Sequence, residues 1–181
     1  MPAPRSTTSL ALLTVLMLAA CGGASDSAPA SKAGDGAATP APASTPATSV
    51  ATATSATDSI GRQVFMTCST CHQANGQGIP GTYPPLAGSH IATGAPEIPI
   101  AIVLHGMSGP LTVEGKTYNN LMTAWGPMFN DVQVAAVLTY VRSQWGNSAP
   151  PVTAAQVAAV RAKTSARKTP WTWPELQAFK F

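Results

Sequence analysis

Cys68-Ser69-Thr70-Cys71-His72 is the stretch that decides how this sequence is interpreted. The thiols of Cys68 and Cys71 are three positions apart, so one helical turn brings them to the same side, and His72 follows directly. Two thiols at this spacing can form thioethers with the two vinyl groups on one side of a porphyrin, and the neighbouring imidazole then reaches the iron as proximal ligand. The C-x-x-C-H pattern therefore predicts one haem c, attached through Cys68 and Cys71, with His72 as a metal ligand.

Two other uses of paired cysteines are less well supported by the sequence. A Cys68–Cys71 disulfide or a thioredoxin-like redox pair also has the C-x-x-C spacing, but such a pair normally lies in a βαβ context, which is absent here. A zinc site would need two further ligands at metal-binding spacing. The remaining cysteine, Cys21, lies at the end of an apolar leader and has a different expected role.

Residues 1–20 have the features of a secretory signal peptide. Arg5 supplies a positive start, and the apolar run that begins at Leu10 is too short to cross a membrane comfortably. The run ends in Leu18-Ala19-Ala20-Cys21, which resembles the lipobox of bacterial lipoproteins, where cleavage precedes a cysteine that is then lipidated. We therefore expect a periplasmic protein, lipid-anchored to a bacterial membrane through Cys21. Ordinary cleavage with an unmodified Cys21 is the alternative.

Residues 21–57 lack the side chains that build a core. After the lipidated Cys21 they contain almost only Ala, Gly, Ser, Thr, Pro, Asp, Lys and Val, which predicts a disordered linker. Every Trp, Tyr, Phe and His lies beyond residue 64, so one core is confined to the second half of the chain. The formal net charge of +3, without a dense run of Lys and Arg, argues against nucleic acid as a partner.

Residues 58–147 are predicted to form one small all-α domain. Asp58 is expected to N-cap a short helix that runs into the C-x-x-C-H motif. The Gly- and Pro-rich residues 73–89 predict a loop. The apolar residues within 97–105 predict a second helix, which Gly106 would stop.

The second half of this domain begins with a weaker signal. Residues 111–118 are compatible with a small hairpin. Asn130 and Gln133 have the spacing of a capping box before the amphipathic run 134–145, which predicts the last helix of the domain. Gly146 is expected to end that helix.

Residues 148–181 form a C-terminal tail with its own helix signal. Thr153 and Gln156 resemble a second capping box before an Ala- and Val-rich run. We expect this short helical tail either to pack back on the domain through Trp171 and Trp173 or to dock on a partner protein.

From Cys68 onward the chain resembles the small class I bacterial cytochromes c, and the resemblance covers about residues 58–147. In that family an N-terminal helix with a Gly and an aromatic residue crosses a C-terminal helix with an aromatic residue. Gly61 and Phe65 precede the motif here, and Tyr140 lies on the last helix. A Gly at the crossing would let the two backbones approach closely.

The resemblance also assigns residues around the haem. Residues 135–147 closely match the terminal helix of cytochrome domains found with periplasmic dehydrogenases and reductases. In the family, a Pro carbonyl about a dozen residues past the His accepts the imidazole N–H, and Pro84 fits that spacing. The resemblance further implies that Trp125 packs on the haem and excludes water.

The family usually supplies the sixth ligand of the iron from a Met followed by a Pro. By register Met122 is that ligand, with Thr123 where the Pro is usual, and this departure predicts a weaker iron–sulfur bond or a more mobile loop. Met128, Met107 and His105 are the other candidates.

Ligation by His72 and Met122 would leave no vacant position on the iron, which implies an electron carrier rather than an enzyme. We expect a membrane-tethered periplasmic monohaem cytochrome c that passes single electrons between redox proteins such as a dehydrogenase, a reductase or a terminal oxidase. The alternatives are a fixed electron-transfer subunit of a dehydrogenase or reductase complex, with 148–181 as docking element, and a haem enzyme or sensor with an open coordination site.

Overall fold

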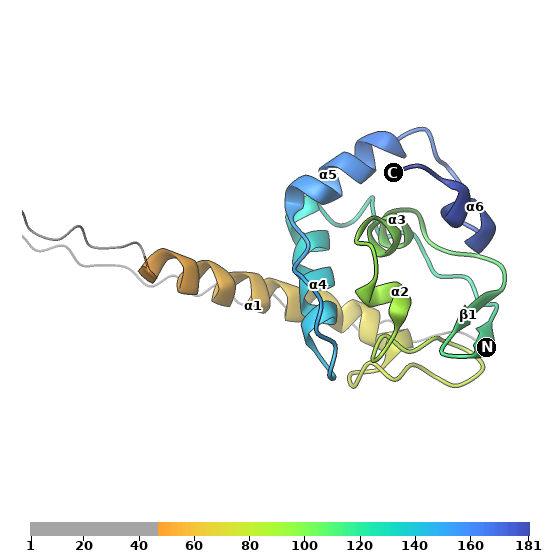
Figure 1. Ribbon diagram of the computed structural model, residues 1–181, viewed down its shortest axis with the longest axis horizontal. Coiled ribbons are helices and arrows are strands. Elements are labelled where there is room, and N and C mark those ends of the chain that lie inside the picture. Colours follow the sequence, from red (N-terminus) through yellow and green to blue (C-terminus); the bar gives the residue numbers. More distant parts are fainter. Residues whose placement is uncertain (1–46) are drawn as a thin grey trace, which may run out of the picture. The chain divides into compact units, whose positions relative to one another are not determined.

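The computed structural model describes residues 47–181, with side chains from residue 56 onward (Figure 1). The predicted signal peptide, Cys21 and most of the predicted linker lie outside the described residues. Among residues 47–181 no helix combines the length and the apolar character needed to span a membrane. The elements are α1 (Ala47–His72), α2 (His90–Thr93), α3 (Glu97–His105), β1 (Leu111–Val113), β2 (Lys116–Tyr118), α4 (Asp131–Ser143), α5 (Ala154–Lys163) and α6 (Trp173–Ala178).

The first helix is longer than predicted. The expectation that it begins at Asp58 is wrong, because α1 begins at Ala47 and includes the last part of the predicted linker. Between Ala47 and Ile60 the sequence contains no Gly or Pro that would stop a helix, so α1 extends back into the Ala-rich segment. The Asp58 side chain does not cap; it lies 3.7 Å from the guanidinium of Arg62, one turn further along.

The crossing of α1 and α4 is the central packing contact of the domain (Figure 1). At Gly61 the α1 backbone lies so close to α4 that a Cβ atom would collide with the carbonyl oxygen of Ala136 and would lie 2.8 Å from Cβ of Tyr140. One turn later the ring of Phe65 packs between Tyr140 and Trp145, with centroid separations of 5.4 and 5.0 Å. The predicted crossing at Gly61 is therefore confirmed.

The remaining helices follow local signals in the sequence. α3 occupies Glu97–His105 as predicted and ends at Gly106, whose φ of 80° suits a residue without a side chain. α4 begins at the predicted capping box, in which the Asn130 and Gln133 side chains each bond the other's backbone N–H. The helix ends at Ser143 rather than at the predicted Gly146.

Three features of the strand and loop regions complete the domain. The predicted hairpin is present, with β1 and β2 antiparallel and Leu111 paired with Tyr118, so that both side chains face the core. The predicted loop 73–89 is followed by the short helix α2, which the sequence analysis missed. Ser89 caps α2, since its hydroxyl accepts a hydrogen bond from the Ala92 N–H.

The tail 148–181 packs back on the rest of the unit. α5 begins at the predicted Thr153–Gln156 capping box and packs on α3 and α4. α6 begins at a similar cap, in which the Glu175 carboxylate accepts hydrogen bonds from the backbone N–H and the hydroxyl of Thr172. Trp171 is only 2% exposed and belongs to the main core, whereas Trp173 is partly buried against it.

Replacing Gly61 by Ala should destabilise the protein even though Ala is the better helix former. The new Cβ collides with the α4 backbone, and overpacking of this kind costs about 1–3 kcal/mol of unfolding free energy. The matched control is Ser59→Ala, an exposed position of the same helix, which should change that free energy by less than about 0.5 kcal/mol. Denaturant unfolding measures both; equal stability of the two variants would contradict the close crossing.

Candidate functional site

The C-x-x-C-H motif forms the C-terminal end of α1, next to a cavity of ≈ 290 Å³. Cys68 and Cys71 are free thiols of intermediate exposure, and both line the cavity. His72 lies at the same wall and is buried. Because the motif ends a helix, the two sulfurs and the imidazole reach the cavity from one side, as covalent attachment to a porphyrin requires.

A hydrogen bond to Pro84 fixes the orientation of the His72 ring. The two residues are 2.9 Å apart from Nδ1 to the carbonyl oxygen, and a carbonyl can only accept, so Nδ1 carries the proton. Burial lowers the pKa of His72, while the bond to Pro84 partly opposes that change. The ring is therefore neutral at neutral pH, with the lone pair of Nε2 available to bind a metal.

The loop after the motif is shaped to bring the Pro84 carbonyl to His72. The N–H of Gly78 donates to the His72 carbonyl oxygen at 2.9 Å, which folds the loop back under the helix end. A Cβ atom at Gly78 would collide with the carbonyl oxygen of Tyr83 and would lie 2.5 Å from that of Pro84. A side chain at this position would therefore push away the acceptor of the imidazole proton.

Met122 lies in an extended segment that also lines the cavity. Its backbone pairs with Met107, with N–H···O distances of 2.8 and 3.1 Å in the two directions. Gly106 permits this approach, since a Cβ atom there would collide with the Met122 carbonyl. Directly opposed residues of an antiparallel pair place their side chains on the same face, so both methionines face the cavity.

The other candidate ligands are placed differently. Met128 is 70% exposed and lies outside the cavity lining. His105 is also outside it and bonds the Thr164 hydroxyl through Nε2 at 2.7 Å. Met107 lines the cavity but is 4% exposed and belongs to the core beside Met122. Of the candidate ligands, Met122 and Met107 are thus the two that line the same cavity as the motif.

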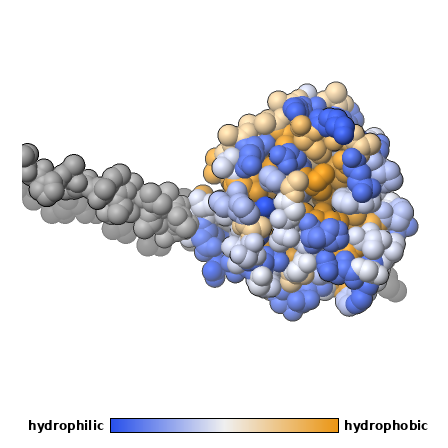
Figure 2. Space-filling model, in the orientation of Figure 1, coloured by the Kyte–Doolittle hydropathy of each residue, from blue (hydrophilic) through white to orange (hydrophobic). Residues whose placement is uncertain are grey.

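The rest of the cavity wall is apolar and suits a large planar hydrophobic group. Figure 2 shows hydrophobic residues gathered towards the middle of one face of the domain, with hydrophilic residues around them. Trp125 lines the cavity, and its ring stacks on Phe129 with an interplanar angle of 19°; its packing on the haem stays a prediction. The apolar lining comes from α3, the hairpin and α4, and includes Ile102, Val103, Leu111, Val113, Val137 and Leu138.

The environment of the Cys68 thiol does not favour a thioredoxin-like redox pair, and the zinc interpretation lacks support among the described residues. Burial raises the pKa of the Cys68 thiol to about 11, whereas a thioredoxin-like pair depends on a depressed thiol pKa. Within the part of the chain that the structure describes, no three His, Cys, Asp or Glu side chains are grouped as a metal site. The zinc interpretation therefore lacks its ligands there.

Comparison with known proteins settles the family. A family model described as Cytochrome c matches residues 59–145. Cytochrome c-552 of Thermus thermophilus is 39% identical over 113 residues, which span 57% of this chain and 85% of that relative. The chain belongs to the cytochrome c family. It has the small class I fold, binds one haem c covalently through Cys68 and Cys71 of its C-x-x-C-H motif, and is an electron-transfer protein.

Other relatives of this cytochrome are subunits of larger enzymes. The cytochrome c subunit of the quinone alcohol dehydrogenase of Gluconacetobacter polyoxogenes is 33% identical over 97 residues, and that of gluconate 2-dehydrogenase from Pantoea cypripedii is 37% identical over 98 residues. Each match spans 52% of this chain but only 20% and 22% of the respective relative. Both relatives are cytochrome c subunits of dehydrogenases, to which this electron-transfer cytochrome is similar over part of their length.

Two buried polar side chains that support the site escaped the sequence analysis. Asn147 accepts a hydrogen bond from the Gly88 N–H and donates to the carbonyls of Leu86 and Val141, which joins the loop after the motif to the end of α4. Arg142 is 3% exposed and donates to backbone carbonyls of α2 and of the tail. Neither had a local signal, because most of their partners lie 48 to 61 residues away in the sequence.

Gly78→Ala should loosen the bond between His72 and Pro84. The new Cβ displaces the Pro84 carbonyl, so the His72 Nδ1 proton should exchange faster in NMR of the reduced holoprotein. Unfolding free energy should fall by about 1–3 kcal/mol relative to the control, the cost of an unsatisfied buried group. Gly81→Ala is that control: its φ of 75° gives similar backbone strain, but its added Cβ meets nothing within 4 Å. Equal proton exchange in both variants would contradict the role of Gly78.

Proposed function

We propose that this cytochrome is a membrane-tethered periplasmic electron shuttle whose iron is held between His72 and Met122. The proposal depends chiefly on one observation, the shared cavity that is lined by both attachment thiols, the oriented imidazole and the Met122 side chain. The bound haem supplies a one-electron change between ferric and ferrous iron. Neutral sulfur ligation in a buried site favours the reduced form relative to two imidazole ligands.

The residues of this chain hold both ligands still while the charge on the iron changes. The Pro84 carbonyl fixes the imidazole tautomer and makes Nε2 more basic. Backbone pairing with Met107 holds the segment that carries Met122. Trp125 and the apolar wall line the cavity, and around a bound haem they would exclude water from the site. With His72 and Met122 both binding the iron, the haem would have no open position for a substrate, so electron transfer rather than substrate chemistry is the expected activity.

Exchange of electrons with partners is expected at the porphyrin edge near the two thioethers. The loop after the motif borders this region through Tyr83, and its Ile79 side chain is 38% exposed. A small apolar contact here suits weak, transient docking of another redox protein. The dehydrogenase subunits among the relatives support redox enzymes as the class of partner.

Location and tethering follow from the leader. A signal peptide over 1–20 and a lipid on Cys21 would keep the protein at a membrane surface in the periplasm, and the following linker would give the domain reach. Tethering raises the local concentration near membrane partners without tight binding.

A fixed subunit of a dehydrogenase or reductase is the second candidate function, favoured by the relatives that are such subunits. The packing of the tail favours the shuttle, since Trp171 is buried within the domain and is not free to dock on a partner. An enzyme or sensor with an open coordination site is less well supported, because a methionine lines the cavity beside the motif.

Met122→Ala should remove the sixth ligand. The ferric protein should lose the long-wavelength absorption band that reports a methionine sulfur on the iron, and the reduced protein should bind carbon monoxide. Met107→Leu is the matched control, since it changes the neighbouring methionine of the same cavity and keeps its volume. Loss of the band in Met107→Leu, with an unchanged Met122→Ala, would reassign the ligand.

Cys21→Ser should release the protein from membranes, because the acyl chains are attached to that thiol. Fractionation of cells that express the full chain, with detection of haem in the membrane and soluble fractions, measures the effect. Retention of the variant on the membrane would show that the apolar leader itself is the anchor.

A further inference from the structure

We propose that the C-terminal tail positions the methionine ligand: residues 148–181 hold the ligand loop, defined as residues 119–130, in the geometry that places Met122 on the iron. This inference rests on the proposed ligation by Met122. Arg161 and the backbone of Trp171 are its positioning residues.

The ligand loop has a specific need for such support. Thr123 follows Met122 where the family usually has a Pro, so the chain lacks the fixed φ angle that would stiffen this position. The pairing with Met107 is a single isolated bridge rather than a continuous ladder. An isolated bridge restrains one residue pair, so Met107 must itself be held if it is to hold Met122.

The tail supplies that restraint through backbone hydrogen bonds to the two residues that flank Met107. The Ser108 N–H donates to the Trp171 carbonyl at 2.7 Å, and the Trp171 N–H donates to the Gly106 carbonyl at 3.0 Å. Residues 106–108 are thus bonded to Met122 on one side and to Trp171 on the other. A movement of Met122 away from the cavity would have to break this pairing or carry the tail with it.

Trp171 is firmly anchored where it makes this contact. Its ring is buried and packs against Phe179 at a centroid separation of 5.2 Å, with Phe181 next to it. The guanidinium of Arg167 lies 3.6 Å above the ring centroid, and that group also binds Glu175 at 2.7 Å. The last residues of the tail therefore fix the backbone of Trp171 against the 106–108 segment.

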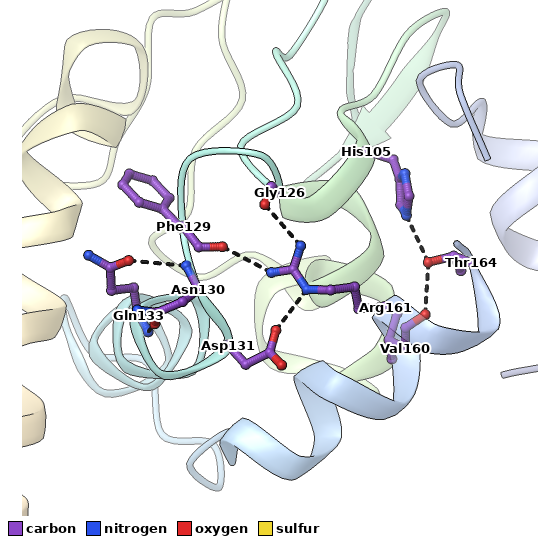
Figure 3. Close-up of polar contacts among 9 residues, drawn as sticks. All are labelled: His105, Gly126, Phe129, Asn130, Asp131, Gln133, Val160, Arg161 and Thr164. Atoms are coloured by element: carbon purple, nitrogen blue, oxygen red, sulfur yellow. Dashed lines mark hydrogen bonds and ion pairs between the residues drawn. The ribbon is translucent and has the colours of Figure 1, made fainter. Parts of the chain in front are cut away.

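Arg161 of α5 holds the other end of the ligand loop (Figure 3). Its guanidinium donates to the carbonyl of Gly126 at 2.9 Å, to that of Phe129 at 2.9 Å and to the Asp131 carboxylate at 2.8 Å. One rigid fork of donors thus spans the turn that leads from the loop into α4. Lys in this place would keep the charge but could not bond all three oxygens in this geometry.

Between these two contacts the loop has little freedom. The N–H groups of Trp125 and Gly126 donate to the carbonyls of Val103 and Leu104, near the end of α3, at 2.9 and 3.1 Å. The same α3 packs against α5, which carries Arg161. The ligand loop is therefore enclosed between α3 and the tail, and the tail provides the stiffness that Thr123 does not.

The test uses the full holoprotein and the variant Arg161→Ala, with Lys163→Ala as matched control. Lys163 is an exposed cation on the same helix. In Arg161→Ala we expect a weakened ferric methionine–iron band, at least about tenfold tighter or faster carbon monoxide binding to the reduced protein, and faster hydrogen exchange over 119–130, since charge-assisted hydrogen bonds to the loop are lost. Lys163→Ala should match the wild type in all three.

Further variants keep the test decisive if Arg161→Ala does not fold. Asp131→Asn removes only the carboxylate partner and Arg161→Lys keeps only the charge, so both should give smaller changes of the same sign. A purely structural role would lower the unfolding temperature without changing the band or carbon monoxide binding well below that temperature, and that result overturns the inference. If Met122→Ala itself leaves the ferric spectrum unchanged, the proposed ligation fails and this inference fails with it, whereas a purely structural result for Arg161→Ala overturns this inference alone.

Discussion

The close contact between the backbones of α1 and α4 at Gly61 sets the geometry on which the rest of the structure depends. The attachment motif is the end of α1, so the angle and depth at which α1 crosses α4 determine where two thiols and an imidazole reach the cavity. Phe65, packed between Tyr140 and Trp145, holds the helix in that orientation one turn before the motif. A small displacement at the crossing would move all three attachment groups together.

With His72 and Met122 as the proposed ligands, the contacts around the site would hold both side chains in place while the charge on the iron changes. Burial keeps His72 neutral, and the Pro84 carbonyl selects the tautomer that leaves Nε2 free. Backbone pairing with Met107 holds Met122 from one side, and apolar side chains line the rest of the cavity. Ligands that need not rearrange when an electron arrives make transfer fast, and this is the physical basis of a carrier as distinct from a catalyst.

The C-terminal tail contributes both to the core of the domain and to the support of the ligand loop. Trp171 belongs to the main core, and Arg161 bonds the turn at which the ligand loop enters α4. The same contacts that stabilise the fold therefore restrain the loop that carries Met122, the proposed sixth ligand. In the proposed role of the tail, restraint from distant residues replaces the local restraint that a Pro at position 123 would give.

Much of this molecule could be predicted from the sequence, because many of its structural features depend on patterns that span only a few residues. The C-x-x-C-H motif, the Asn130–Gln133 and Thr153–Gln156 capping boxes and the Gly106 stop depend on neighbours within one helical turn, and the family resemblance added the Pro84 acceptor and the Gly61 crossing. The start of α1 was misplaced, since Asp58 is a good cap in isolation but nothing before it interrupts the helix. Only the tertiary structure decided that Met107 lies beside Met122 and that Arg161 reaches the carbonyls of Gly126 and Phe129. Those partners are far apart along the chain, and they meet only because the packing of α3, α4 and α5 brings them together.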